Sequence, residues 1–171
     1  MTRSAFSFVL AVLLVAPVFS LSDTVIATET AAISQRKALY GRYLDQVHIT
    51  NGSVPAATAF ASLFTDDALL DVGPVGVFYN KSQIYQAART VFPAGISWSH
   101  FLFVTPIIEV QYPRYATGDW YFSAPFIARV TPFFAPPFPA VGTFYGSFKE
   151  IYVKCDNVWK FKEVHVQVSI V

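Results

Sequence analysis

The stretch 83–110, QIYQAARTVFPAGISWSHFLFVTPIIEV, is where the character of the sequence changes. Up to Pro93 the apolar residues are spaced as on one face of a helix, and Pro93 with Gly95 is a typical helix end. From Trp98 onward the chain is rich in Val, Ile and Phe, which favour strands. The stretch therefore divides the chain into a helical first half and a second half built of strands.

Three helices are expected before this point. The segment 31–47, AAISQRKALYGRYLDQV, has apolar residues at helical spacing and is predicted to form an amphipathic helix. Ser53, with a proline two residues later, marks the start of a second helix that runs to Phe64. Ser82 is the expected N-cap of a third helix over 83–92.

Four strands are expected after the helices, over 98–111, 115–130, 142–154 and 158–170. Pro106 removes a backbone donor, so the first of them lies at a sheet edge or is bulged there. Helices that precede strands, rather than alternate with them, favour an α+β domain with the helices packed on one face of a curved, mainly antiparallel sheet.

Length and composition limit the partners. A chain of 171 residues suits one domain, and a content of 54% hydrophobic and 17% aromatic residues allows a large core. The formal net charge is +1 with no basic stripe, so neither nucleic acid nor an anionic membrane surface is an expected partner. Charged residues make up only 13% of the chain, which favours a homodimer. The proline-rich segment 130–142, VTPFFAPPFPAVG, is expected to be an apolar loop that caps a pocket or lies at a dimer contact.

The N-terminus has the order of a secretory signal peptide. Arg3 precedes an apolar run over 6–18, and small residues follow, so cleavage is expected after Ser20 or Ser22. The run is short for a transmembrane span, although an uncleaved anchor is the alternative. We therefore expect a signal peptide over 1–22, a single mature domain over 23–171, secretion, and no membrane association of the mature chain.

Secretion would permit disulfides and glycans. Cys155 is the only cysteine, so the fold is expected to depend on packing alone. Asn51 and Asn80 each begin an Asn-x-Ser sequon in a turn-like context and are candidate glycosylation sites.

The order of these elements resembles the SnoaL-like branch of the nuclear transport factor 2-like superfamily, which includes scytalone dehydratase, ketosteroid isomerase and bile-acid dehydratase. Five stretches carry the resemblance: ALYGRYLDQV (38–47), FASLFTDDALLDVGPVGVFYNKSQI (60–84), SHFLFVTPIIEV (99–110), YATGDWYF (115–122) and GSFKEIYVKCDNVWKFKEV (146–164). The resemblance implies a cone-shaped α+β fold whose sheet encloses a pocket. Enzymes of this family remove a proton next to a carbonyl without a cofactor, and other members only bind ligands, so fold alone does not fix activity.

The family pattern singles out a histidine and a tyrosine as catalytic candidates. His100, six residues before Pro106, resembles the pocket histidine of the family, and an imidazole can accept and return a proton near neutral pH. Its alternative is a strand-start histidine bonded to backbone. Tyr43 resembles the helix tyrosine that holds a substrate carbonyl oxygen, and Tyr40, one turn earlier, is a candidate substrate-binding residue. The alternative for both tyrosines is packing on the sheet.

The sequence departs from the family where an aspartate usually follows Tyr43 by five residues. His48 occupies that place and is expected either to substitute as a base or to cap the helix end as a cation. Asp45 is only two residues beyond Tyr43, about 200° round a helix. It could serve in place of the usual aspartate if the helix distorts, but its position favours a solvated surface carboxylate. An arginine that bile-acid dehydratases carry near the C-terminus is replaced by Val164.

Further site candidates follow from strand alternation. Asp119 and Trp120 point to opposite faces of one strand, and an inward Asp119 beside His100 would make an acid/base couple. Trp120, Phe103 and Asp71, the last at the pocket mouth, are the other expected substrate-binding residues.

The sequence shows no metal signature, phosphate loop or nucleophile motif, so no metal and no cofactor are expected. Our expectation is a secreted lyase or isomerase acting on a small hydrophobic polyketide- or steroid-like molecule. The alternatives are a secreted protein that binds an apolar ligand without turnover, and a structural dimer whose cone is filled by phenylalanines.

Overall fold

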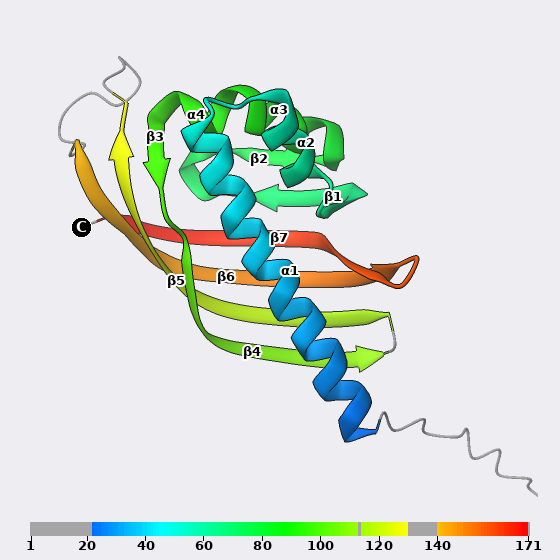
Figure 1. The fold of residues 1–171 in the computed structure, drawn as a ribbon. Coiled ribbons are helices and arrows are strands. Elements are labelled where there is room, and N and C mark those ends of the chain that lie inside the picture. Colours follow the sequence, from blue (N-terminus) through cyan, green and yellow to red (C-terminus); the bar gives the residue numbers. More distant parts are fainter. Residues whose placement is uncertain (1–21, 113, 130–139, 171) are drawn as a thin grey trace, which may run out of the picture.

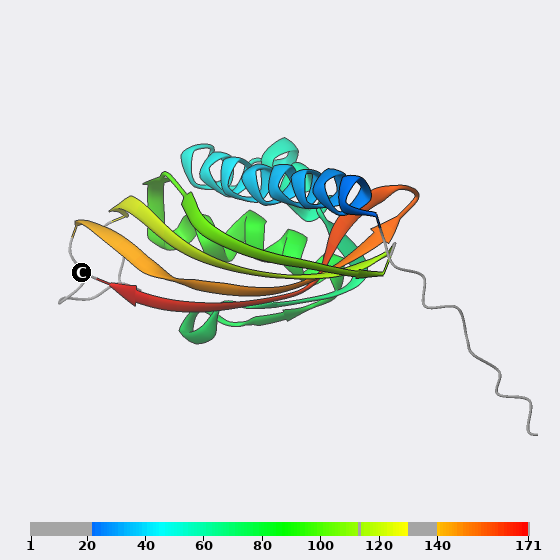
Figure 2. The ribbon, with the colours of Figure 1, turned by 90° about the horizontal axis from the view of Figure 1, so that it is seen from below.

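In a computed structural model, which describes residues 22–112, 114–129 and 140–170, one long helix lies across the concave face of a curved sheet (Figures 1 and 2). This helix, α1 (Asp23–Ile49), begins eight residues before the expected start and has Ser22 as its N-cap. Its first half is tied to the far end of the sheet, because the Glu29 carboxylate accepts hydrogen bonds from Lys154 at 2.6 Å and from Trp159 at 2.7 Å. These bonds to Lys154 and Trp159 hold the pKa of Glu29 below its ordinary value.

The remaining helices cover one end of the sheet. They are α2 (Val54–Ala61), a 3-10 turn (Gly73–Val75), α3 (Asn80–Gln86), a π-helical turn (Ala87–Val91) and α4 (Phe92–Gly95). The second helix ends three residues before the predicted end, and Phe64 instead begins a strand. Pro93 stands in the first turn of α4, where a missing backbone N–H is tolerated, rather than ending a helix.

The sheet has seven strands in the order β2-β1-β7-β6-β5-β3, with β4 also paired to β5. Their bounds are β1 (Phe64–Asp71), β2 (Val77–Tyr79), β3 (Ile96–Ser99), β4 (Leu102–Tyr112), β5 (Tyr115–Ala128), β6 (Val141–Cys155) and β7 (Val158–Ile170). Only the β1–β7 pair is parallel within the described strands. The predicted α+β fold with a curved, mainly antiparallel sheet is confirmed.

The first predicted strand is divided in two. Pairing with β5 stops after Ser99 and resumes at Leu102, and a second irregularity lies at Thr105–Pro106, where Thr105 has φ +48°. Pro106 therefore stands at a bulge of an edge strand, as expected. The His100 N–H still bonds the Pro125 carbonyl of β5, but the break leaves the Phe101 N–H free to bond a side chain, which positions the site described below.

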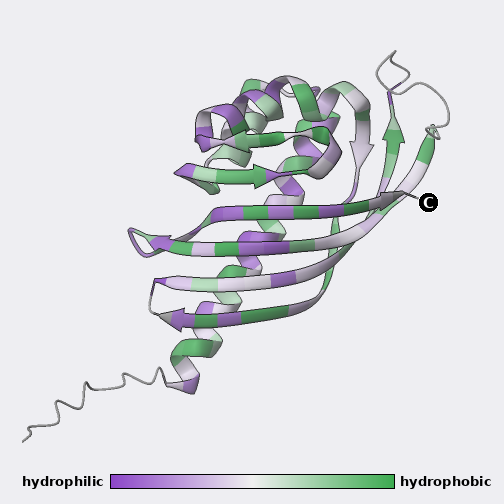
Figure 3. Ribbon diagram, turned by 180° about the vertical axis from the view of Figure 1, so that it is seen from behind, coloured by the Kyte–Doolittle hydropathy of each residue, from purple (hydrophilic) through white to green (hydrophobic). Residues whose placement is uncertain are grey.

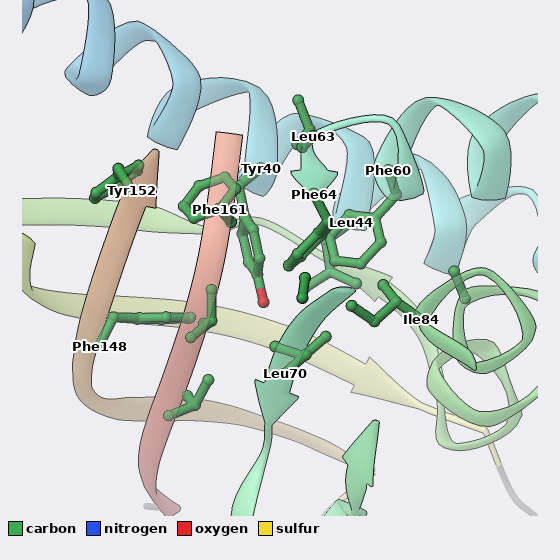
Figure 4. Close-up of a cluster of buried hydrophobic side chains, with 14 of the residues drawn as sticks. Tyr40, Leu44, Phe60, Leu63, Phe64, Leu70, Ile84, Phe148, Tyr152 and Phe161 are labelled. Atoms are coloured by element: carbon green, nitrogen blue, oxygen red, sulfur yellow. The ribbon is translucent and has the colours of Figure 1, made fainter. Parts of the chain in front are cut away.

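The core between α1 and the sheet is aromatic. Figure 4 shows Tyr40, Phe60, Phe64 and Phe161 pointing toward one another from α1, α2, β1 and β7. The Tyr40 ring lies 5.0 Å from the ring of Phe60 and 5.4 Å from that of Phe161, both edge to face, which is a favourable geometry for aromatic pairs. Phenylalanines thus fill much of the cone, as the structural-dimer alternative supposed.

Gly146 in β6 is required by close packing. A Cβ at this position would collide with the backbone oxygen of Gln167 on β7 and lie 2.8 Å from the Phe122 ring. We expect Gly146→Ala to lower the free energy of unfolding by about 1–3 kcal/mol, as overpacked cores do. Urea denaturation measures the loss, and Ser147→Ala on the same strand is the matched control. Equal stability of the two variants would show that β7 moves to accommodate the added methyl group without a loss in the free energy of unfolding.

Two sequence expectations fall mainly outside the described residues: the signal peptide over 1–22 and the loop over 130–142. Among the helices that are described, none is both long and apolar enough to cross a membrane.

Candidate functional site

A polar cluster forms where the end of α1 packs against β3. The Asp45 carboxylate accepts a hydrogen bond from the Ser99 hydroxyl at 2.7 Å through Oδ1, and the Phe101 N–H, left free by the strand break, lies 3.3 Å from the same oxygen. Asp45 is buried, so the expectation of a solvated surface carboxylate is wrong. The side of α1 that carries Asp45 packs against the edge strand β3, a contact that no local sequence pattern predicts.

The second member of the cluster is His48. Its Nδ1 lies 2.6 Å from the Ser99 Oγ. Since Ser99 gives its single proton to Asp45, the histidine nitrogen is the donor in this bond. Burial, with a contribution from the Arg129 guanidinium, lowers the pKa of His48 to about 3. His48 is therefore neutral at physiological pH, and the idea that it caps the helix end as a cation is wrong.

His100 stands at the outer edge of the cluster. Its Nδ1 is 3.7 Å from Asp45 Oδ2, and its side chain is 59% exposed. Strand alternation explains the exposure: Ser99 points inward, while the His100 N–H bonds the Pro125 carbonyl at 3.1 Å and the ring turns outward beside Trp98. A histidine facing the enclosed pocket, as the family pattern implied, is therefore not what the structure shows.

Burial has the largest influence on the pKa of Asp45, and it raises this pKa. The hydrogen bonds from Ser99 and Phe101 and the attraction of His100 act in the opposite direction. A carboxylate whose charge is weakly solvated binds a nearby cation strongly. The Asp45 carboxylate therefore faces the His100 Nδ1 as a partner that can orient the ring, as an acid/base histidine requires.

A second cluster, built round a pair of charged side chains, lies in the interior of the cone. Lys37 on α1 donates to Glu150 on β6 at 2.5 Å, Tyr152 donates to the other carboxylate oxygen, and the lysine and glutamate side chains are at most 1% exposed. The Lys37 Nζ also lies 3.3 Å from the Phe148 ring centroid and 4.2 Å from that of Phe103. Cations bind favourably to such ring faces.

Desolvation outweighs the attraction within this pair. It lowers the pKa of Lys37 to about 8 and raises the pKa of Glu150, so each group is displaced toward its neutral form. The spacing of residues in the sequence contains a signal for this pair. Lys37 falls on the apolar stripe of α1 between Ile33 and Tyr40, and Glu150 shares the inward face of β6 with Phe148 and Tyr152.

The other predicted site residues are dispersed. Asp119 is exposed on the outer face of β5, so the predicted couple of Asp119 with His100 is wrong; the inward set is Ala116, Gly118, Trp120 and Phe122. Trp120 and Phe103 line the interior near Lys37. The Trp120 Nε1 is buried there without a well-formed hydrogen bond.

Tyr40 is buried in the core and Tyr43 is half-buried against it. Asp71 accepts a bond from the Gly73 N–H at 2.9 Å and faces His165 at 3.5 Å, far along the sheet from His100. Asn51 and Asn80 are both exposed. Within the described ranges, no group of three or more His, Cys, Asp or Glu side chains is placed to hold a metal ion.

Comparisons with known proteins agree with this architecture. The hexachlorocyclohexane dehydrochlorinase LinA-type3 from Novosphingobium barchaimii LL02 is similar with a TM-score of 0.71 and 14% identity, over 88% of this chain and 93% of that chain. A nuclear transport factor 2 (NTF2-like) superfamily protein from Salmonella enterica serovar Typhimurium LT2 has a TM-score of 0.64 and 18% identity, over 83% and 92% of the two chains. Identities this low show a common fold alone.

A search of curated protein sequences gave no significant match. The family model of the SnoaL-like domain, however, matches residues 26–165, which is most of the chain and includes both polar clusters. The protein therefore belongs to the SnoaL-like domain family.

Proposed function

We propose that this protein is a cofactor-independent lyase or isomerase that moves a proton next to a carbonyl of a small hydrophobic molecule. The observation that carries the proposal is the buried Asp45 carboxylate 3.7 Å from the Nδ1 of an accessible histidine, His100. A carboxylate that orients and stabilises an imidazolium is what a general base of this kind requires.

The proposed reaction of a β-hydroxy ketone is redox-neutral. With Nδ1 facing Asp45, Nε2 of His100 removes the proton from the carbon next to the carbonyl, and the electron pair forms an enolate. The enolate then expels the β-hydroxyl, which takes the proton back from His100 and leaves as water. Tyr43 stays a prediction for the group that holds the carbonyl oxygen, since the structure gives it no contact with His100.

Secretion is part of the proposal. Helix α1 begins at Asp23 with Ser22 as its N-cap, so cleavage after Ser20 would leave the helix and its cap intact, whereas cleavage after Ser22 would remove the cap. Sequencing the N-terminus of the protein exported from its own cells is the direct measurement.

A secreted protein that binds an apolar ligand without turnover is the second candidate. It is favoured by the open position of the His100 ring, which at 59% exposure is not shielded from water.

One experiment separates the two functions. A panel of flat and saturated β-hydroxy ketones is incubated with the protein in D₂O and followed by NMR. A lyase or isomerase produces an enone or an isomer, or exchanges the proton next to the carbonyl for deuterium. Binding without any of these changes would contradict the enzymatic proposal and support the second candidate.

A further inference from the structure

A groove is bordered by α2, β1 and α3, at the end of the sheet that the short helices cover (Figure 1). Its volume is about 670 Å³, which lies within the range of about 300–1,000 Å³ that small-molecule sites occupy. Hydrophilic residues are interspersed with hydrophobic ones along β1 and the neighbouring helices (Figure 3). The described residues that line the groove include neither Asp45, Ser99 nor His100, so it is separate from the candidate site above.

The more buried part of the groove is apolar. Ala61 of α2 is 4% exposed, and the half-buried Tyr85 of α3 packs against the hydrophobic core. Packing against the core holds the Tyr85 ring in place. A fixed, half-buried aromatic ring can offer its face to the apolar side of a ligand.

The exposed lining residues carry hydrogen-bonding groups on opposite sides of the groove. The hydroxyl groups of Thr58 on α2 and Ser82 on α3 make no hydrogen bond within the described part of the chain. Asn80 Oδ1 accepts a bond from the Gln83 N–H at 3.0 Å, which leaves the amide nitrogen, Nδ2, without a described partner. These donors and acceptors are available to a ligand.

The charge of the groove is balanced. Lys81 donates to Asp66 Oδ1 at 2.6 Å, and this bond and the lysine charge hold the pKa of Asp66 below its ordinary value. The carboxylate therefore stays ionised near neutral pH. Its side chain is 93% exposed, and Oδ2 makes no hydrogen bond to a described residue. Since Lys81 and Asp66 cancel one another, the groove favours an uncharged, hydrogen-bonding ligand over an ion.

We propose that this groove is a binding site for a saccharide. Sugar hydroxyl groups donate and accept hydrogen bonds, as the carboxylate, amide and hydroxyl groups of the groove require. The C–H groups of a sugar ring form an apolar face that can pack on the Tyr85 ring. The site is independent of the proposed lyase or isomerase reaction, because the two share no residue.

The saccharide can be free or attached to the chain itself. Asn80, Lys81 and Ser82 form one of the two sequons and all three line the groove, whereas Asn51 of the other sequon does not. Attachment to Asn80 needs a lipid-linked sugar diphosphate as donor: the anomeric carbon leaves the diphosphate oxygen and bonds to Nδ2, which releases one amide proton. This second source rests on the secretion proposed above, and the first does not.

The first experiment uses protein from a bacterial host that adds no N-linked glycan. Methyl glucoside, methyl mannoside and N-acetylglucosamine are titrated by saturation-transfer NMR, and a Kd of about 1 mM is expected for an open groove. Asp66→Ala should weaken binding about 10–100-fold, as loss of a hydrogen bond to a charged group does. Asp67→Ala is the matched control and should bind as the wild type does, because Asp67 is also exposed and pairs with Lys162 at 2.5 Å but does not line the groove.

The second experiment uses protein exported from its own cells. Mass spectrometry of the peptide that contains Asn80 detects an attached glycan. If that glycan lies in the groove, its enzymatic removal should lower the Tm of the wild type by about 2–4 °C, the shift expected for a modest loss of stability in a chain of this size. Removal should leave the Tm of Asp66→Ala unchanged.

The outcomes separate the two sources and the secretion proposal. Binding of a free sugar that Asp66→Ala weakens and Asp67→Ala does not identifies a free saccharide, even if the protein is never exported. A glycan on Asn80 with the Asp66-dependent loss in Tm identifies the chain's own glycan. The proposal is overturned if neither result is found, or if Asp66→Ala and Asp67→Ala have equal effects, which would indicate only a change of surface charge.

Discussion

Replacing His100 by alanine should lower kcat/KM by about 10²–10⁴-fold on any β-hydroxy ketone that the wild type converts, since that is the usual contribution of a positioned acid/base group. The same variant should also lose exchange of the proton next to the carbonyl in D₂O, because that exchange needs only the first proton transfer. The folded state should be little affected, since the ring is 59% exposed.

His165→Ala is the matched control for this experiment. His165 is also exposed and also faces a carboxylate, Asp71, at 3.5 Å, but it lies on the outer face of β7 away from Asp45. It should keep wild-type kcat/KM. Full activity in His100→Ala would remove this residue from the mechanism, and equal losses in both variants would point to a general effect of surface charge.

Asp45→Asn gives an independent check on the carboxylate. The amide oxygen can still accept the hydrogen bond from Ser99, but the side chain no longer carries a charge 3.7 Å from the His100 Nδ1. kcat/KM near pH 7 should therefore fall, by less than in His100→Ala, because the base itself remains. Wild-type kcat/KM in Asp45→Asn would show that the carboxylate has no part in the reaction.

Much of the fold could be predicted from the sequence because its elements are specified locally. The amphipathic pattern of α1, the strand-rich second half and the bulge at Pro106 all follow from neighbouring residues. The ends of elements could not be predicted as well, since Phe64 is apolar in either a helix or a strand and only its pairing with Phe161 on β7 decides the outcome.

The site shows the limit of local reasoning more clearly. Helical periodicity correctly placed Asp45 on a different side of α1 from Tyr43, but the inference that this side faces solvent was wrong. Ser99, its hydrogen-bond partner, is 54 residues away in the sequence, and the contact depends on a break in strand pairing that propensity does not predict. His100, in turn, could be identified as a candidate from the family resemblance, whereas its outward direction follows only from the register of β3 against β5.

Lys37→Met should lower the free energy of unfolding by about 3–5 kcal/mol, because it leaves the Glu150 carboxylate buried without its cation. The loss should be read from urea denaturation near neutral pH. Lys37→Met/Glu150→Gln should recover most of it, since the amide carries no charge and can still accept the hydrogen bond from Tyr152. Comparison of the single with the double variant therefore distinguishes an unpaired buried charge from a loss of packing against the Phe148 ring.

The pH dependence of the single variant gives the sharper test. Without Lys37, the raised pKa of Glu150 should rise further, so between its ordinary value of 4.5 and the raised value the folded state holds a proton that the unfolded state has released. Stability must then fall as the pH rises through that interval, and the penalty of Lys37→Met should be smaller near pH 4 than near pH 7. The double variant has no carboxyl group at this position and should lack this slope. If the penalty were the same at both pH values, Glu150 would be reached by water, and the interior of the cone would be open to a ligand rather than closed around an ion pair.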